Sequence, residues 1–426
     1  MIDFREDTVI TATAANPAFA LRARSWNAEV MFNFGELGYR LVVREGRVTG
    51  FAPDRTGAAA NIVISGPAEA WEKLLSPVPP AAYVDPLFVG HRAGFRVRGN
   101  YERDIAPYYA ALIEFLAILR LLHSGGRSAP PITATDRKFD TTVGRYVYVT
   151  ISGVQHRVYF EQSGSGTVPL LLQHTAGADG SQWRHMLEDA DFQRLFRMIA
   201  YDLPYHGKSR PPTSIPWWEE EYVLTRERLI ETVLAISREL QLDRPVYMGC
   251  SVGGHLAPDL AYYASDEFRA VVGINSGLGV KHPPPATLSP FEQSFISPHV
   301  GAVWSGAANY TLTSPVSPEA YRREVAWGYT QGAPGILAGD TYYYSYDHDL
   351  TEEQARQIDT SKVPVFLLTA EYDPMAFDDG TARLAKAIDG AYFRILPGLG
   401  HFGPAENPLD FKAQVLSLFE QIAQLP

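Results

Sequence analysis

The first 123 residues combine short alternating segments with longer apolar stripes, a pattern that predicts a small mixed α+β domain. Two apolar runs flank Glu45 and Gly46, a pair whose chemistry suits a hairpin turn. Other segments alternate as strands do, or repeat their apolar residues at helical spacing. The predicted elements are a hairpin over 40–51, strands at 61–65 and 95–99, and helices at 67–75 and 105–122.

Beyond residue 144 the pattern changes to strands separated by helical stretches. The first two strands alternate, whereas the later ones are almost continuously apolar. A continuous apolar run is typical of a strand buried on both faces of a parallel sheet. Repeated strand and helix therefore predict an α/β fold with a mostly parallel, doubly wound sheet. The predicted strands are 145–151, 156–161, 168–173, 196–201, 246–248, 270–274, 363–369 and 392–396.

Two regions lack this regular alternation. Residues 124–143 are rich in Gly, Ser, Pro and Thr without a hydrophobic period, which is typical of a linker. Residues from about 276 to 359 are rich in Pro, Gly and aromatic side chains, and we interpret them as a cap inserted over an active site. The predicted organisation is a domain at 1–123, a linker at 124–143 and a second domain at 144–426.

Two stretches of the first domain carry a family resemblance, "ANIVISGPAEAWEKLL" and "FRVRGNYERDIAPYYAALIEFLAILRLL". Together with the glycine hairpin they resemble the sterol-carrier-protein-2-like family over roughly 100 residues. The resemblance implies an apolar tunnel able to bind lipid-like ligands. The alternative is that this domain serves packing, dimerisation or substrate shielding.

Length and charge narrow the classes of partner. A chain of 426 residues exceeds what one hydrophobic core usually supports, so two domains are expected. The formal net charge of −11 leaves no basic field for phosphates, which argues against nucleic acid and against an anionic membrane surface. The expected partners are a small-molecule substrate and further copies of the chain in a homo-oligomer, with a dimer favoured.

Cysteine content and the N-terminus bear on location. The single cysteine, Cys250, excludes an intramolecular disulfide and fits a reducing compartment. The first 25 residues place acidic side chains early and hold no continuous apolar core, so no signal peptide is predicted. No run approaches the roughly 18–20 apolar residues that a membrane span needs. These features predict a cytoplasmic protein without a membrane partner.

The strongest chemical motif is Gly249-Cys250-Ser251-Val252-Gly253, which follows a predicted strand and precedes a helical stretch. In such a nucleophile elbow the turn is so tight that only small residues fit beside it, and the serine hydroxyl stands clear above the sheet. Ser251 is therefore the candidate nucleophile. The alternative is a tight turn with an ordinary serine.

Five motifs occur in a family-like order: "LLLQHTAGADGSQW", "AYDLPYHGKSRPP", "MGCSVGG", "LLTAEYDP" and "LPGLGHF". They resemble the α/β-hydrolase superfamily and cover essentially all of 145–426. The resemblance implies a catalytic triad whose members follow the chain order Ser251, Asp373, His401.

The predicted base and acid follow the last two strands. A histidine with a pKa near about 7 can take the serine proton and return it to the leaving group, and His401 stands in a glycine-containing loop that can reach Ser251. The acid holds the tautomer of the histidine. Asp373 matches the family position, with Glu371 as the alternative.

Acyl transfer also needs two amide donors for the developing oxyanion, each worth about 3–4 kcal/mol. One is expected to be the backbone N–H of Val252, directly after the nucleophile. The other, by resemblance to the His-Gly-x loop of the family, is expected to be Ala176. Thr175 stands where that pattern usually has glycine, a departure that leaves the local backbone open.

Aromatic residues of the cap and the loops predict a largely apolar pocket with few polar anchors. The same side chains serve equally well as core. No glycine-rich phosphate loop and no His/Cys metal spacing occurs in the sequence, so neither a cofactor nor a metal is predicted. The candidates for substrate contact are His174, Trp183, Trp304, Tyr344 and His348.

The favoured function is hydrolysis of a carboxylic ester or lactone of a small, largely apolar or aromatic molecule through an acyl-enzyme at Ser251. An alternative is a C–C bond hydrolase that acts on a diketone-type product of aromatic ring cleavage. Epoxide hydrolases and dehalogenases of the resembled fold are disfavoured because they use a carboxylate nucleophile. A hypothesis from another class is a non-catalytic lipid-binding protein.

Overall fold

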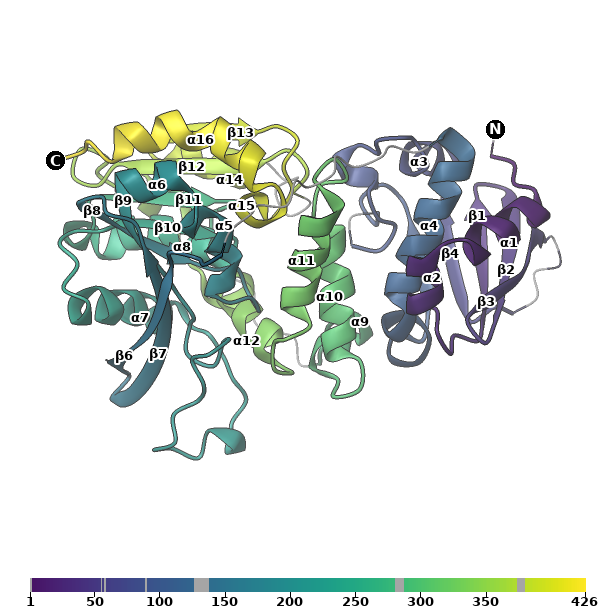
Figure 1. Cartoon of the computed structure of the whole chain (residues 1–426), viewed down its shortest axis with the longest axis horizontal. Coiled ribbons are helices and arrows are strands. Elements are labelled where there is room, and N and C mark those ends of the chain that lie inside the picture. Colours follow the sequence, from purple (N-terminus) through teal and green to yellow (C-terminus); the bar gives the residue numbers. More distant parts are fainter. Residues whose placement is uncertain are drawn as a thin grey trace.

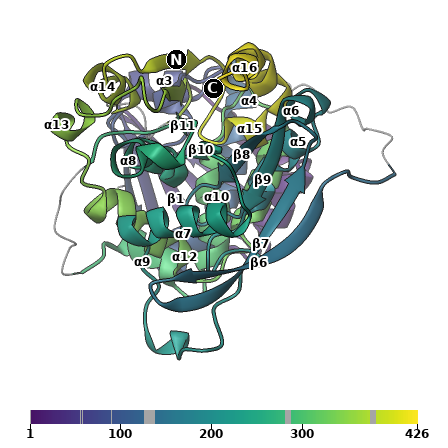
Figure 2. The same ribbon diagram turned by 90° about the vertical axis from the view of Figure 1, so that its left-hand side faces the viewer.

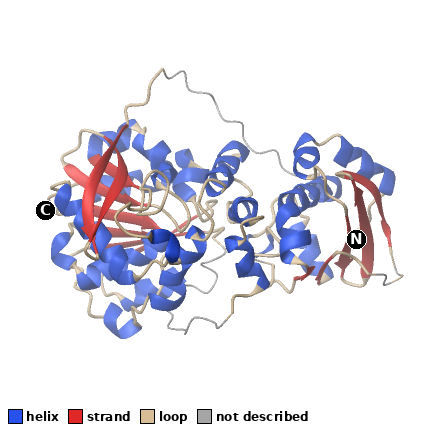
Figure 3. Ribbon diagram, turned by 90° about the horizontal axis from the view of Figure 1, so that it is seen from below, coloured by secondary structure: helices blue, strands red, loops and turns tan. Residues whose placement is uncertain are grey.

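The computed structural model describes residues 2–54, 56, 59–88, 90–125, 138–279, 287–373 and 380–426. It contains a five-stranded and an eight-stranded sheet. The two sheets lie at opposite ends of an elongated molecule, with helices between them (Figure 1). Figure 3 shows the same separation from below. Most of the predicted linker at 124–143 lies outside the described residues.

The five-stranded sheet belongs to residues 2–125, here called the N-terminal unit. Its strand order is β3-β2-β1-β4-β5, and β1 and β4 pair in parallel while the other neighbours are antiparallel. The predicted hairpin is confirmed, because β2 and β3 pair around Glu45 and Gly46, whose φ values of 49° and 76° are left-handed. The strands are β1 (Ala28–Phe34), β2 (Leu37–Arg44), β3 (Arg47–Pro53), β4 (Ile62–Gly66) and β5 (Arg96–Gly99).

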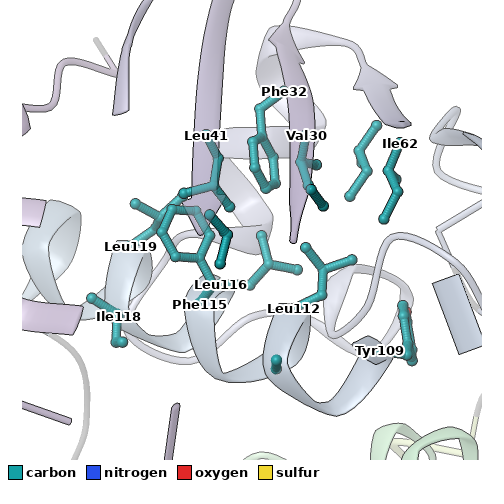
Figure 4. Packing of buried hydrophobic residues seen from close by; sticks show 14 of the residues in the cluster. Val30, Phe32, Leu41, Ile62, Tyr109, Leu112, Phe115, Leu116, Ile118 and Leu119 are labelled. Atoms are coloured by element: carbon teal, nitrogen blue, oxygen red, sulfur yellow. The ribbon is translucent and has the colours of Figure 1, made fainter. Parts of the chain in front are cut away.

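Helix α4 (Tyr109–Ser124) covers one face of this sheet and closes its core. Figure 4 shows Leu112, Phe115 and Leu116 of α4 packed with Val30 and Phe32 of β1. The predicted helices near 67–75 and 105–122 are confirmed. The remaining helices and helical turns of the unit are α1 (Glu6–Ala14), α2 (Pro17–Arg22), α3 (Ala68–Leu74), η1 (Ala81–Tyr83), η2 (Tyr101–Ile105) and η3 (Ala106–Tyr108).

The helical segment Tyr101–Ser124 has the length and composition of a membrane span, with a mean hydropathy of 1.7 in its most apolar window. The prediction that no segment reaches such a length is therefore wrong on those two criteria. In the structure 56% of that window is buried inside the protein. A core helix that closes a sheet meets the same two criteria, so length and composition alone do not make it a span.

The eight-stranded sheet confirms the predicted mostly parallel architecture. Its order is β13-β12-β11-β10-β8-β9-β7-β6. The six strands from β8 to β13 pair in parallel with one another, and only β6 and β7 run antiparallel to their neighbours. The strands are β6 (Val143–Ile151), β7 (Val154–Ser163), β8 (Val168–Gln173), β9 (Phe196–Tyr201), β10 (Val246–Cys250), β11 (Ala270–Ile274), β12 (Val365–Ala370) and β13 (Tyr392–Leu396).

Helices cover both faces of this sheet (Figure 2). Because successive side chains of a strand point to opposite faces, Leu171 packs with α7 and α8, whereas Leu170 and Leu172 pack with α6 and α16. The helices and turns are η4 (Gly180–Trp183), α5 (Arg184–Leu187), α6 (Ala190–Leu195), η5 (Trp217–Glu219), α7 (Arg226–Glu239), α8 (Val252–Tyr263), η6 (Ser265–Glu267), α13 (Glu352–Ala355), α14 (Gly380–Ala387), α15 (Gly403–Glu406) and α16 (Pro408–Ile422).

A group of cap helices lies between the two sheets (Figure 1). They fall within the segment predicted as a cap, of which residues 280–286 lie outside the described ranges. The cap elements are α9 (Pro290–Ile296), α10 (Gly301–Thr311), α11 (Glu319–Tyr329), α12 (Ile336–Tyr342) and η7 (Tyr343–Asp347).

The cap is packed tightly against the N-terminal unit. Trp304 of α10 is fully buried, with its ring centroid 5.5 Å from that of Phe88 and 5.4 Å from that of Tyr109. Arg323 of α11 forms an ion pair of 2.5 Å with Glu114 of α4. Val300, Trp304 and Ala307 therefore belong to the same hydrophobic core as the five-stranded sheet.

Candidate active site

Ser251 stands on a sharp turn between β10 and α8. Its backbone has φ 56° and ψ −113°, a conformation that non-glycine residues rarely adopt. A Cβ atom on Gly253 would lie 2.5 Å from Cγ of Gln173, and one on Gly249 would lie 2.4 Å from the backbone of Gly253. The turn thus has the geometry predicted for a nucleophile elbow, and larger residues are excluded by contact.

His401 and Asp373 form a buried pair after the last two strands. Nδ1–H of His401 donates to Oδ1 of Asp373 over 2.8 Å. Asp373 follows β12 and His401 follows β13, so the carboxyl ends of neighbouring parallel strands place both side chains at the same edge of the sheet. With the proton fixed on Nδ1, Nε2 of His401 carries the free lone pair.

Glu371, the alternative acid, is placed differently. Its side chain is exposed, and its carboxylate accepts a hydrogen bond of 2.8 Å from the N–H of Gly398. It does not border the cavity that holds Ser251. The geometry therefore favours Asp373 over Glu371 as the partner of His401.

Asn275 is a site residue that the sequence analysis missed. Its Nδ2 donates to the carbonyl oxygen of His401 over 3.1 Å, and its Oδ1 accepts from the N–H of Ala370 over 2.9 Å. The side chain thus ties the histidine loop to the end of β12. The available signal was a polar residue directly after the apolar strand 270–274, where an active-site edge is expected.

Of the two expected oxyanion donors, Val252 directly follows Ser251 at the turn and Ala176 lines the cavity. Val252 is the first residue of α8, so its N–H has no carbonyl of its own helix to bond. The neighbours of Ala176 are engaged: the N–H of Thr175 donates to Gln182 over 2.8 Å, and that of Gly177 donates to Asp340 over 2.7 Å. Within the described residues, no hydrogen bond is found for the N–H of Ala176 or of Val252.

Thr175, which stands where the resembled pattern usually has glycine, ties this loop to the cap. Its side chain is buried, and its hydroxyl oxygen lies 2.5 Å from the hydroxyl of Tyr329 on α11. The departure from the family pattern thus adds a contact from the loop to the cap.

Ser251, Asp373 and His401 border one open cavity of about 1830 Å³. Ala176 and Asn275 also line it. Most of its aromatic lining comes from the cap and the N-terminal unit, namely Phe88, Phe95, Tyr101, Phe291, Phe295, Tyr329, Tyr342, Tyr344 and Tyr346.

Of the five predicted substrate contacts, Tyr344 alone lines this cavity. Trp183 is fully buried in the core beneath the sheet, and Trp304 is buried between the cap and the N-terminal unit. His174 is also buried: Nδ1–H donates to the carbonyl of Thr175 over 2.8 Å and Nε2 accepts from the N–H of Leu203 over 3.0 Å. The prediction of substrate contact is corrected for Trp183, Trp304 and His174, because packing or loop bonding occupies each of them.

His348 requires the same correction, and its surroundings reveal a second histidine. His348 is fully buried and does not line the cavity, but its Nδ1 lies 3.3 Å from Nδ1 of His255, which does. On its other side, Nε2 of His348 lies 3.2 Å from Asp259. Tyr343 donates to that carboxylate over 2.5 Å. Burial, together with nearby His348 and His401, lowers the pKa of His255 well below its ordinary value.

Cys250 lies beneath the histidine loop. Cys250 is buried, its thiol donates to the carbonyl of His401 over 3.2 Å, and burial raises its pKa. In the part of the chain that the structure describes, no group of three or more His, Cys, Asp or Glu side chains is arranged to hold a metal ion.

A family model described as alpha/beta hydrolase fold matches residues 168–408, which is more than half of the chain. Solved structures share the fold at low sequence identity. The thermophilic esterase from Thermogutta terrifontis has a TM-score of 0.54 at 17% identity and covers 66% of this chain and 100% of its own. The enol-lactonase from Burkholderia xenovorans has a TM-score of 0.52 at 20% identity and covers 65% and 100%.

Curated relatives align over shorter stretches. The bifunctional epoxide hydrolase 2 of Rattus norvegicus is 31% identical over 34% of this chain and 24% of its own length. A 2-hydroxy-6-oxononadienedioate/2-hydroxy-6-oxononatrienedioate hydrolase of Burkholderia vietnamiensis is 29% identical over 33% of this chain and 47% of its own. The chain thus spans about a quarter of the first relative's length and just under half of the second's.

Proposed function

Because the chain belongs to the alpha/beta hydrolase fold family, we propose that it is a serine hydrolase that cleaves a carboxylic ester or lactone through an acyl-enzyme at Ser251. The observation that carries the proposal is that Ser251, His401 and Asp373 all border one cavity. Ser251 stands on the strand-to-helix turn, and His401 borders the same cavity with its ring oriented by Asp373. A Ser/His/Asp triad needs this combination of a hydroxyl that borders the cavity, an oriented imidazole and a buried carboxylate.

In the proposed reaction, Nε2 of His401 takes the proton of Ser251 as Oγ attacks the carbonyl carbon of the substrate. The N–H groups of Val252 and Ala176 bind the oxyanion that forms. When the tetrahedral intermediate collapses, the C–O bond breaks and His401 gives its proton to the leaving oxygen. Water, deprotonated by His401, then attacks the acyl-enzyme and releases the acid and free Ser251.

The cavity supports a larger substrate than the small molecule expected from the sequence. Ligand pockets for drug-sized molecules usually have about 300–1,000 Å³, whereas this cavity has about 1830 Å³. Its lining includes many aromatic side chains, whereas its Arg, Asp and Glu residues are Arg96, Glu220, Glu221, Glu292, Asp373 and Arg383. We therefore assign an extended, mainly apolar or aromatic ester or lactone as the substrate class.

C–C bond hydrolysis is a second candidate function, and His255 is the observation that favours it. When a C–C bond is cleaved, the leaving group is carbanion-like and must accept a proton on carbon. His255 borders the cavity four residues after Ser251 and offers an imidazole separate from His401. To test this function, the enzyme is incubated with a vinylogous diketone of the ring-cleavage type. Cleavage is measured as a loss of the diketone's absorbance. Turnover of the diketone with no turnover of esters or lactones would favour it.

The predicted sterol-carrier-protein-2-like nature of the N-terminal unit is also a proposal. The glycine hairpin and the apolar helix α4 over the sheet support it. Binding of a fluorescent fatty acid to the full-length Ser251→Ala variant, with displacement by a second lipid, is the expected result. Failure of the variant to bind would count against it.

The decisive experiment for the proposed function uses an alkyl fluorophosphonate and intact-protein mass. Oγ of Ser251 is expected to attack phosphorus and release fluoride, which adds one phosphonyl group to the wild type. Ser251→Ala should gain no mass, and the wild type should turn over p-nitrophenyl esters or lactones. A folded wild type that gains no adduct would refute the proposal and favour the non-catalytic lipid-binding alternative.

A further inference from the structure

The cavity that holds Ser251 continues past the cap to the N-terminal unit. Phe88 and Tyr101 of the N-terminal unit line it together with Phe291 and Phe295 of α9. We call these four side chains the junction wall. They lie outside residues 168–278, which supply the nucleophile and the oxyanion loop, so the far side of the cavity is built by a different part of the chain.

The rings of the junction wall contact one another and form a continuous surface. The centroid of Phe291 lies 5.0 Å from that of Phe88, 6.0 Å from that of Tyr101 and 5.5 Å from that of Phe295. These separations lie in the range that aromatic pairs favour. The four rings therefore pack on one another as one aromatic surface.

The wall is also supported from behind. The buried ring of Trp304 lies 5.5 Å from Phe88 and 5.6 Å from Phe295. A hydrogen bond of 2.8 Å from Ser297 to Glu102 joins the end of α9 to the N-terminal unit. Phe88 of the N-terminal unit and Phe295 of α9 thus pack on the same tryptophan, and a hydrogen bond joins α9 to the N-terminal unit. These contacts hold the wall in one position.

Charged side chains at the edge of the wall are engaged with the backbone. Nη1 of Arg96 donates to the carbonyl oxygens of His91 and Phe95 over 3.1 and 2.7 Å. The carboxylate of Glu292 accepts the N–H of Ser289 over 2.8 Å. The wall itself consists of three phenylalanine rings and one tyrosine ring, so it suits an alkyl or aryl group better than a charged one.

We propose that the junction wall binds the distal hydrophobic end of the substrate, an alkyl or aryl chain that extends from the carbonyl group at Ser251. This inference rests on the proposed function and adds a specificity role for the N-terminal unit. Burial of each methylene group against the wall favours binding about fourfold. The ratio of kcat/KM between long-chain and short-chain esters should therefore be set by residues outside the eight-stranded sheet.

The direct test is a crosslink in the wild-type full chain. An alkyl fluorophosphonate with a diazirine at the far end of a ten-carbon chain is first attached to Ser251 and then irradiated. Peptide mass spectrometry should locate the crosslinks in residues 86–105 and 288–296. An adduct whose crosslinks all fall within 168–278 would overturn the inference, whereas absence of the adduct itself would refute the proposed function instead.

A kinetic test uses Phe88→Ala and Phe291→Ala with p-nitrophenyl decanoate and acetate. Each variant should lower the decanoate-to-acetate ratio of kcat/KM at least tenfold, mainly through KM of the decanoate, and Phe88→Leu should restore part of it. Tyr108→Ala is the matched control, because Tyr108 belongs to the same unit but stacks on Trp26 outside the cavity. Unchanged ratios in both phenylalanine variants, or a wild type that does not prefer the decanoate, would overturn the inference.

Discussion

His255 and His348 face each other through their Nδ1 atoms, which lie 3.3 Å apart at the edge of the substrate cavity. Such a contact needs one N–H and one lone pair, so it is lost when both rings carry two protons. Asp259 lies 3.2 Å from the opposite nitrogen of His348. The lone pair of this contact is therefore sensitive to acid.

The stability of the protein should fall as the pH drops below about 6.5, and His255 should contribute to that loss. Burial and the neighbouring His348 and His401 lower the pKa of His255 in the folded state, whereas an unfolded chain protonates it near its ordinary value of about 6.5. The unfolded state then binds more protons, and each depressed histidine lowers the free energy of unfolding by up to about 1.4 kcal/mol per pH unit. Above about pH 6.5 the contribution is fully present.

Urea unfolding of the wild type and of His255→Gln between pH 7.5 and 5 would measure this effect. The variant should show a shallower pH slope. His299→Gln, which replaces an exposed histidine of the cap region, is the control and should keep the wild-type slope. Identical slopes for the wild type and His255→Gln would contradict the assignment.

Asp373→Asn should lower kcat by about 10³–10⁴-fold, because the amide no longer holds Nδ1–H of His401 or stabilises the imidazolium. Thermal stability should remain close to that of the wild type, since the amide fits the same space. Glu371→Gln is the matched carboxylate-to-amide control and should retain most of the activity. Steady-state hydrolysis of a p-nitrophenyl ester measures both variants, and an equal loss in the two would reverse the assignment of the acid.

Asp340→Ala should destabilise the protein by about 3–5 kcal/mol. This buried carboxylate of α12 accepts hydrogen bonds from the N–H of Gly177, from Nε2 of His206 and from the hydroxyl of Tyr222. Burial opposes a charge on His206, but Asp340 outweighs it and raises the pKa of that imidazole. Removal of the carboxylate therefore leaves a buried cation or an unbonded donor.

Chemical unfolding would measure the loss, with Asp389→Ala as the control, because Asp389 is exposed. A decrease smaller than about 1 kcal/mol would mean that solvent replaces the carboxylate. Asp340 also accepts the N–H of Gly177, the residue directly after Ala176. In the variant, esterase activity should therefore be lost at a lower denaturant concentration than the one that unfolds the whole protein.

Trp304→Ala should reduce stability by about 3–5 kcal/mol, the usual cost of emptying a large aromatic site in a core. KM for p-nitrophenyl acetate should stay unchanged, because Trp304 does not line the cavity. Trp327→Ala is the matched control: that side chain is 67% exposed and its removal should cost little. A raised KM for acetate with unchanged stability would restore Trp304 as a substrate contact.

Local patterns predicted the second sheet well. Its strands are buried on both faces and therefore read as apolar runs, and the elbow and triad residues follow strands 246–248, 363–369 and 392–396 within a few positions. Strand β1 of the N-terminal unit was missed. A half-exposed strand is identified by alternating apolar and polar residues. Met31 breaks this alternation, because it is an apolar, buried residue at a position where a polar, solvent-facing one is expected.

The lining of the cavity was harder to predict, because it depends on which side of a helix meets another unit. Trp304 and Tyr344 are both aromatic residues of the cap, yet one packs on the N-terminal unit and the other lines the cavity. His255 lies one helical turn after Ser251 in α8, and this spacing brings it to the cavity. No sequence motif contains it, so nothing in the sequence alone was a reason to select it. The cytoplasmic location and the homo-oligomer stay predictions.

The shared cavity has a consequence for folding if the proposed ligand contact at the junction wall is made, because residues of the N-terminal unit and the region around Ser251 both line it. A ligand that contacts the junction wall and the region around Ser251 binds with full affinity only when both units are folded, so its binding free energy, RT ln(1 + [L]/Kd), stabilises them jointly. Saturation with product should then raise the unfolding temperature of both parts of the chain together. Under the proposal, recognition at the junction wall and catalysis at Ser251 would be linked by thermodynamic cooperativity as well as by position.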